Sequence, residues 1–217
     1  MNINEVFESA LLAQAAYADN LNAGMSASAL AAALSENDNM TETQAEYFAS
    51  RYKVIIQQPT TESGFSATVF QRIGDGSFHM AMRGTDSIVP DFISANAQNL
   101  RYGMALEQVA DMLNFYLEIT GAGEIPQYEF KLVLHTDLAA GQKSFDPLNS
   151  AYRIVFVNKA PINVSGIVGV DTSSQISISG HSLGGHLASA FSLLLPQAVD
   201  HTTTFNNAEI ARIRNAA

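Results

Sequence analysis

The apolar positions near the N-terminus of this chain repeat with a helical period. Residues 1–20, 26–35 and 41–51 each carry apolar side chains along one face, as amphipathic helices do. Ser26 and Ser28 are possible caps of the second of these helices, and the third would begin near Thr41. The pattern therefore predicts three consecutive helices before the first strand.

A β-rich pattern follows these helices. It predicts a strand over 53–58 and a hairpin formed by 65–72 and 78–83 around the turn residues at 74–76. Further along, the pattern predicts a helix over 91–117, strands over 128–135 and 175–179, a helix over 183–195, a strand over 202–205 and the start of a helix over 209–217. This alternation favours a single α/β domain over residues 1–217, with a largely parallel sheet flanked by helices.

Composition and charge exclude several classes of function. Hydrophobic residues make up 47% and charged residues 15% of the 217-residue chain, as expected for a globular domain with a well-buried core. The net charge of −10 argues against a nucleic-acid partner and against docking on anionic lipid. The chain contains no cysteine, which excludes disulfides and thiolate metal sites. No apolar run reaches about 18 residues, so we expect no transmembrane segment.

The most specific motif is Gly180-His181-Ser182-Leu183-Gly184, which fits the pattern G-x-S-x-G between a predicted strand and a predicted helix. In that pattern the serine stands on a sharp turn, and the residues two positions away on either side must lack bulky side chains. The turn directs the first helix amide, here that of Leu183, at a developing oxyanion. The motif therefore predicts Ser182 as the nucleophile of an acyl-transfer reaction.

A second motif, Arg83-Gly84-Thr85, ends a predicted strand. A tetrahedral intermediate needs two amide donors, one after the nucleophile and one from a loop that follows another strand. We expect the Thr85 amide to be the second donor, and Arg83 to fix the loop by pairing with Asp86 or Asp91. Alone, the motif is also typical of a turn that only terminates a strand. Its combination with the serine motif favours the donor role.

The runs Met82-Arg83-Gly84-Thr85-Asp86-Ser87 and Gly180-His181-Ser182-Leu183-Gly184-Gly185-His186-Leu187-Ala188 together resemble the class 3 lipase family of α/β-hydrolases. Runs at 11–17, 64–70 and 103–109 are more similar to the bacterial branch that contains secreted, calcium-dependent lipases. The resemblance implies an α/β-hydrolase fold and a serine carboxylic-ester hydrolase (a lipase or esterase) acting on acylglycerols or simpler esters. It implies Ser182 as nucleophile and Thr85 and Leu183 as oxyanion donors. It also favours secretion without an N-terminal signal peptide over a cytoplasmic location.

The stretch 136–174 departs from the pattern of this family, in which the strand before the serine motif runs almost directly into it. Its β-rich runs at 152–157 and 164–170 predict an inserted hairpin or small cap. Such an insertion could border the acyl pocket or act as a lid. It could equally be a surface insertion with no part in catalysis.

A second departure concerns the catalytic triad. The chain ends at Ala217, whereas in α/β-hydrolases the acid and then the histidine follow the serine. We therefore expect either a fragment of a longer protein, with a sheet incomplete at the C-terminus, or a rebuilt triad. Glu209, just past the strand over 202–205, is the best local candidate for the acid. His201, in the segment most easily displaced, is the first candidate for a base donated by another chain.

Two hypotheses of function follow. The first is a serine ester hydrolase that works by two-step acyl transfer and needs neither a metal nor an organic cofactor. The second is a catalytically impaired hydrolase-fold fragment, or a module that binds lipid or protein and lacks the triad acid and histidine. A sheet cut off after the strand over 202–205 would expose an edge that pairs readily with another chain, so we also expect a homo-oligomer.

Overall fold

A five-stranded sheet forms the centre of the protein, which the computed structural model describes at residues 2–36, 39–84, 105–140, 144–145, 152–167 and 169–206. Its strands are β1 (Tyr52–Gln58), β2 (Ala67–Arg72), β3 (Phe78–Met82), β7 (Ile176–His181) and β8 (Val199–Phe205), in the order β1-β2-β3-β7-β8. β1, β2 and β3 pair antiparallel, whereas β7 pairs parallel with both β3 and β8. The α/β class is confirmed, but the sheet is mixed and not largely parallel.

The connections between strands explain this mixed sheet. The turn between β2 and β3 is short, and a tight turn can join only antiparallel neighbours. The predicted hairpin around residues 74–76 is confirmed, with Gln71 paired to Phe78 beside the turn. β7 and β8 are instead joined by α6 (Leu183–Leu194) and the short 3-10 helix η3 (Pro196–Ala198), which is the long crossover that parallel neighbours require.

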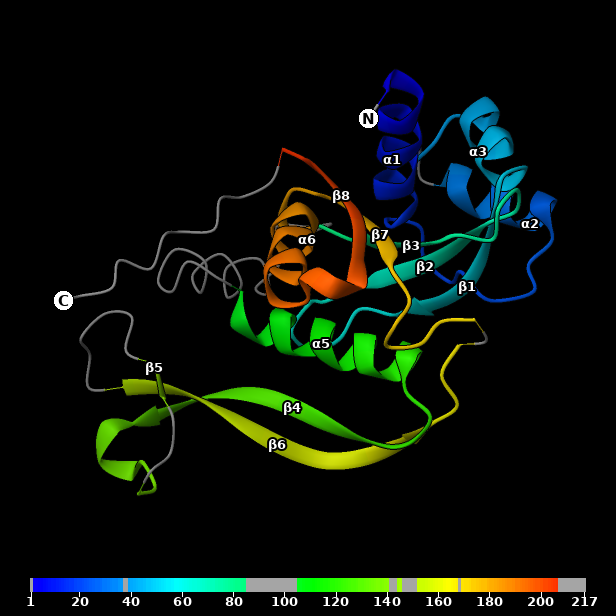
Figure 1. The fold of residues 1–217 in the computed structure, drawn as a ribbon. Helices are drawn as coiled ribbons and strands as arrows, with labels where there is room; N and C mark the ends of the chain where they lie inside the picture. Colours follow the sequence, from blue (N-terminus) through cyan, green and yellow to red (C-terminus); the bar gives the residue numbers. More distant parts are fainter. Residues whose placement is uncertain are drawn as a thin grey trace.

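Helices cover both faces of this sheet (Figure 1). α1 (Ile3–Ala15), α2 (Ala27–Ser35) and α3 (Glu42–Ala49) pack on one face, and α5 (Leu106–Thr120) and α6 pack on the other. Neighbouring residues of β2 show the alternation: Phe70 packs with the N-terminal helices, and Val69 packs with α5 and α6. Burying each such side chain stabilises the fold by about 1.5–3 kcal/mol.

The three N-terminal helices begin at side-chain caps. The Asn2 side chain accepts from the amides of Asn4 and Glu5, and the Ser26 hydroxyl accepts from the amide of Ala29. Thr41 forms a capping box in which the Gln44 side chain accepts in return from the Thr41 amide. The helices predicted over 1–20, 26–35 and 41–51 are confirmed, with α1 and α3 shorter than expected.

A second sheet lies outside α5 and is built around a long antiparallel ribbon (Figure 1). Its strands are β4 (Gly123–Leu134), β5 (Ser144–Phe145) and β6 (Tyr152–Val164), in the order β4-β6-β5, with the 3-10 helix η2 (His135–Asp137) after β4. Asn114 of α5 joins the ribbon to the domain, because its side-chain amide donates to the Tyr128 carbonyl at 2.8 Å and its side-chain oxygen accepts from the Tyr128 amide at 2.9 Å.

The ribbon differs from the insertion predicted over 136–174 in its boundaries and in its strand pairing. The strand predicted over 128–135 belongs to β4, and β4 pairs with β6 and not with the main sheet. The β-rich element therefore begins at Gly123, before the predicted boundary. Among the described residues of the run over 164–170, Val164 ends β6 and an isolated bridge joins Ile167 to Val170, so these residues do not form a second hairpin strand. A role for the ribbon as cap or lid stays a prediction.

Within the described ranges, no helix is both long enough and apolar enough to span a bilayer. β8 is the last strand on its side of the described sheet, so the edge at which we expected another chain to pair is β8 itself. The predicted homo-oligomer stays a prediction.

Candidate active site

Ser182 stands at the junction of β7 and α6 with φ 56° and ψ −123°. The other non-glycine residues with positive φ in the described chain are Asn20 and Asn206, a residue type that tolerates the left-handed region. Serine in such a conformation costs about 1–3 kcal/mol and persists only where the surrounding structure imposes it. The sharp strand-to-helix turn that the sequence motif predicts is therefore present at Ser182.

The two motif glycines explain how the turn is imposed. A Cβ at Gly180 would collide with the carbonyl group of Gly184. A Cβ at Gly184 would collide with the carbonyl oxygen of Met82, at the end of β3. Because every colliding atom belongs to the backbone, no side-chain rotation could make room. Both positions therefore require glycine, which allows α6 to start directly against β3.

The first amides of α6 lie next to Ser182. His186 is the first residue whose amide bonds within the helix, donating to the Ser182 carbonyl at 3.2 Å. The amides of Leu183, Gly184 and Gly185 precede it and have no partner inside the helix, as at any helix N-terminus. These donors and the helix dipole favour negative charge beside Ser182.

The segment that follows β3 passes against the same turn. A Cβ built at Gly84 would lie 2.6 Å from the His181 carbonyl oxygen and 3.4 Å from the Ser182 Cβ, and it would collide with the Tyr17 hydroxyl. The two sequence motifs therefore meet in space, as expected. Thr85, the predicted second oxyanion donor, is the next residue, and it lies outside the described residues, as do Asp86, Asp91 and Glu209.

Arg83 forms an ion pair with Asp19, while its expected pairing with Asp86 or Asp91 stays a prediction because both residues lie outside the described ranges. Its guanidinium donates to the Asp19 carboxylate at 2.6 Å, just after α1. The Arg83 side chain is only 12% exposed, so its charge needs such a partner more than a surface arginine would. Sequence reasoning missed Asp19 because no local pattern links a residue after the first helix to the end of β3.

Three described histidines lie on β7, α6 and β3. His181 Nδ1 lies 3.0 Å from the Tyr17 hydroxyl, and His186 is fully buried in the first turn of α6. His79 Nε2 lies 2.9 Å from the Ser179 hydroxyl. Among the residues that the structure describes, no histidine side chain is hydrogen-bonded to the Ser182 hydroxyl.

His201 lies at the opposite end of its strand from the serine. Phe205, four residues further along β8, pairs with His181, so His201 is about 13 Å along the strand from the turn. Within one chain, the structure therefore does not bring His201 to the serine, and a base donated by another chain stays a prediction.

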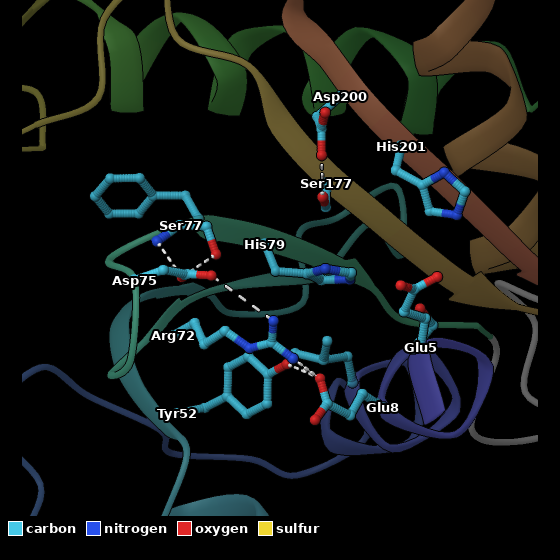
Figure 2. A pocket seen from close by; sticks show the side chains of 13 residues that line it. Glu5, Glu8, Tyr52, Arg72, Asp75, Ser77, His79, Ser177, Asp200 and His201 are labelled. Carbon is cyan, nitrogen blue, oxygen red and sulfur yellow. Dashed lines mark hydrogen bonds and ion pairs between the residues drawn. The ribbon is translucent and has the colours of Figure 1, made fainter. Parts of the chain in front are cut away.

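His201 instead lines a cavity of about 430 Å³ between α1 and the amino-terminal ends of the parallel strands, which Figure 2 shows from close by. His79 lines the same cavity. Burial lowers the pKa of His79 to about 3, with smaller contributions from the charges of His201 and Arg72. His79 is therefore neutral at physiological pH.

The charged side chains of this cavity are already paired within the chain. Arg72 forms ion pairs with Glu8 of α1 and, at 3.7 Å, with Asp75. Asp200 accepts from the Ser177 hydroxyl at 3.1 Å (Figure 2). The groups around the cavity thus connect α1 to the sheet, and the strained turn at Ser182 lies at the other end of the strands.

Across the described residues, no group of three or more His, Asp or Glu side chains is arranged to hold a metal ion. Comparisons with protein-family models, with curated proteins and with solved structures found no match for this chain.

Proposed function

We propose that this protein is a serine carboxylic-ester hydrolase with an α/β-hydrolase fold, acting on acylglycerols or simpler esters through Ser182. The observation that carries the proposal is the backbone of Ser182, at φ 56° and ψ −123° between β7 and α6. Strained backbone of this kind clusters at functional sites, where the surrounding structure holds it in place. Gly180 and Gly184 hold the strained turn through backbone contacts that no other residue type would permit.

The proposed chemistry is a two-step acyl transfer. The Ser182 oxygen attacks the ester carbonyl while a base takes its proton, and the alcohol leaves to give an acyl-enzyme that water then hydrolyses. The amide of Leu183 stabilises the oxyanion from the start of α6, and the Thr85 amide is the proposed second donor. One well-placed oxyanion donor contributes about 10²–10³-fold to the rate.

One observation favours a second candidate. Because no described histidine is bonded to the Ser182 hydroxyl, the serine has no visible general base in this arrangement. A hydrolase-fold module that binds lipid or protein, with an unactivated serine, would fit that observation. The retained strain at Ser182 favours the hydrolase, since a binding module gains nothing from it.

A fluorophosphonate probe tests the two candidates, because it labels only an activated serine. We expect the wild-type protein to be labelled and to hydrolyse p-nitrophenyl butyrate. We expect Ser182→Ala to lose both activities while keeping its fold by circular dichroism. Ser173→Ala, in the turn before β7, is the matched control and should be labelled as the wild type is. A folded wild-type protein that the probe does not label would refute the hydrolase proposal and favour the binding module.

A further inference from the structure

The four residues after α1, Ala16 to Asp19, contact both segments that meet at Ser182. We call this segment the α1 exit. The Tyr17 hydroxyl lies 3.0 Å from His181 Nδ1, on the residue just before the serine. Asp19 pairs with Arg83 at 2.6 Å, on the segment that follows β3. One short stretch of chain is thus attached to both the serine turn and the loop proposed to carry the second oxyanion donor.

The α1 exit is itself firmly held. The amides of Tyr17 and Ala18 donate to carbonyls of the last turn of α1, at 3.1 and 3.2 Å. The Gln57 side chain of β1 donates to the Ala18 carbonyl at 2.7 Å, and Ala16 is fully buried. Side chains that project from so fixed a backbone can hold their partners in place.

The Tyr17 hydroxyl also shares its immediate surroundings with the nucleophile. The space that a Cβ at Gly84 would occupy is bordered by the Tyr17 hydroxyl, the His181 carbonyl oxygen and, at 3.4 Å, the Ser182 Cβ. Gly84 therefore allows three chain segments to approach one another at this point. A movement of the Tyr17 ring would therefore change its contacts with both the serine turn and the segment after β3.

We propose that Tyr17 is a positioning residue for Ser182, which it acts on through His181, while Asp19 holds the facing segment through Arg83. This inference rests on the proposed ester hydrolysis. The hydrogen bond fixes the His181 side chain and hence the backbone that enters the strained turn. The Ser182 oxygen and the Leu183 amide then keep the relative positions that a developing oxyanion requires. Tyr17 acts by geometry, through the contact between its hydroxyl and His181 Nδ1.

The test is Tyr17→Phe, which removes the hydroxyl and keeps the ring. Displacing reacting groups by about 1 Å costs up to about 10²-fold in rate, and the loss of one hydrogen bond should displace them less. We therefore expect about a 10-fold fall in kcat and in the rate of fluorophosphonate labelling, with KM changed less than 2-fold. Tyr47→Phe makes the same chemical change on α3 and is the matched control, with wild-type rates expected.

Variants of His181 show whether Tyr17 acts through it. His181→Ala should lose as much rate as Tyr17→Phe, and the double variant no more than either, because both changes remove the same bond. His181→Asn can keep a polar group near the position of Nδ1 and should recover part of the rate. Full additivity of the two losses, or a wild-type rate in Tyr17→Phe, would overturn the inference.

A measurement that needs no activity separates this inference from the proposed function. Backbone amide shifts of Ser182, Leu183 and Gly84 in a ¹⁵N-labelled protein report the local geometry directly. We expect Tyr17→Phe to move all three, and Tyr47→Phe to move none. An unlabelled wild type with moved shifts would reject ester hydrolysis and keep the positioning role of Tyr17. Unmoved shifts would reject that role.

Discussion

Replacing Gly184 with alanine sets two physical effects of opposite sign against each other. In a helix interior alanine is more favourable than glycine by about 1 kcal/mol, so helix propensity predicts a stabilised protein. The surroundings of Gly184 predict the reverse. A Cβ there would collide with the Met82 carbonyl oxygen and would lie 2.8 Å from the carbonyl carbons of Met82 and Arg83. To relieve this collision, α6 and the end of β3 must move apart.

The expected size of the effect follows from that displacement. Overpacking that forces backbone shifts costs about 1–3 kcal/mol, and here it must exceed the gain in helix propensity. We expect Gly184→Ala to lower the free energy of unfolding by about 2 kcal/mol, which in a domain of this length lowers Tm by about 4–8 °C.

Gly74→Ala is the matched control, because a Cβ at Gly74 meets nothing within 4 Å and its φ is not in the left-handed region. We expect that change to alter stability by less than about 0.5 kcal/mol. Differential scanning calorimetry and urea unfolding of the three proteins provide the comparison. A Gly184→Ala protein as stable as the wild type, or more stable, would refute the account of the close contact between α6 and β3.

Two further predictions concern buried and strained groups. The folded pKa of His79, about 3, is below its ordinary 6.5, so neutral His79 adds stability above pH 6.5 that is lost as the pH falls towards 3. Between pH 7 and pH 4.5 the free energy of unfolding, measured by urea titration, should fall by about 2–3 kcal/mol more in the wild type than in His79→Gln. Equal decreases in the two proteins would contradict this prediction. The free energy of unfolding should be about 1 kcal/mol higher in Ser182→Gly than in Ser182→Ala, because only glycine relaxes the backbone strain at position 182. Equal Tm values for these two variants would show that the turn is not strained.

The parts of the fold that the sequence predicted correctly are those determined by short stretches of chain. The capping residues Ser26 and Thr41 mark the starts of α2 and α3, and the glycine-containing turn at 74–76 gives the β2–β3 hairpin. The turn at Ser182 is partly of this class, since a Cβ at Gly180 would collide with Gly184, which is close to it in the sequence.

The failures concern contacts between distant residues. An apolar, β-rich run such as 128–134 has the same pattern whether it joins a central sheet or an outer ribbon, and here it pairs with β6. Periodicity gives no sign of the direction of β1 relative to β2, and this second antiparallel pair beside the predicted hairpin makes the sheet mixed where we predict a largely parallel one. The contact between Tyr17 and His181 joins residues 164 positions apart, and only the resemblance of the run over 11–17 singled out that tyrosine.

The backbone of Ser182 is bonded on both sides of its strained turn, and this bears on what the turn is for. The Ser182 amide donates to the Phe205 carbonyl at 2.9 Å, and the Ser182 carbonyl accepts from the His186 amide at 3.2 Å. These bonds and the glycine contacts together offset the strain, but none of them needs a hydroxyl at position 182. Glycine there would keep both bonds and remove the strain. A serine in this position is therefore better explained by the chemistry of its side chain than by the stability of the fold.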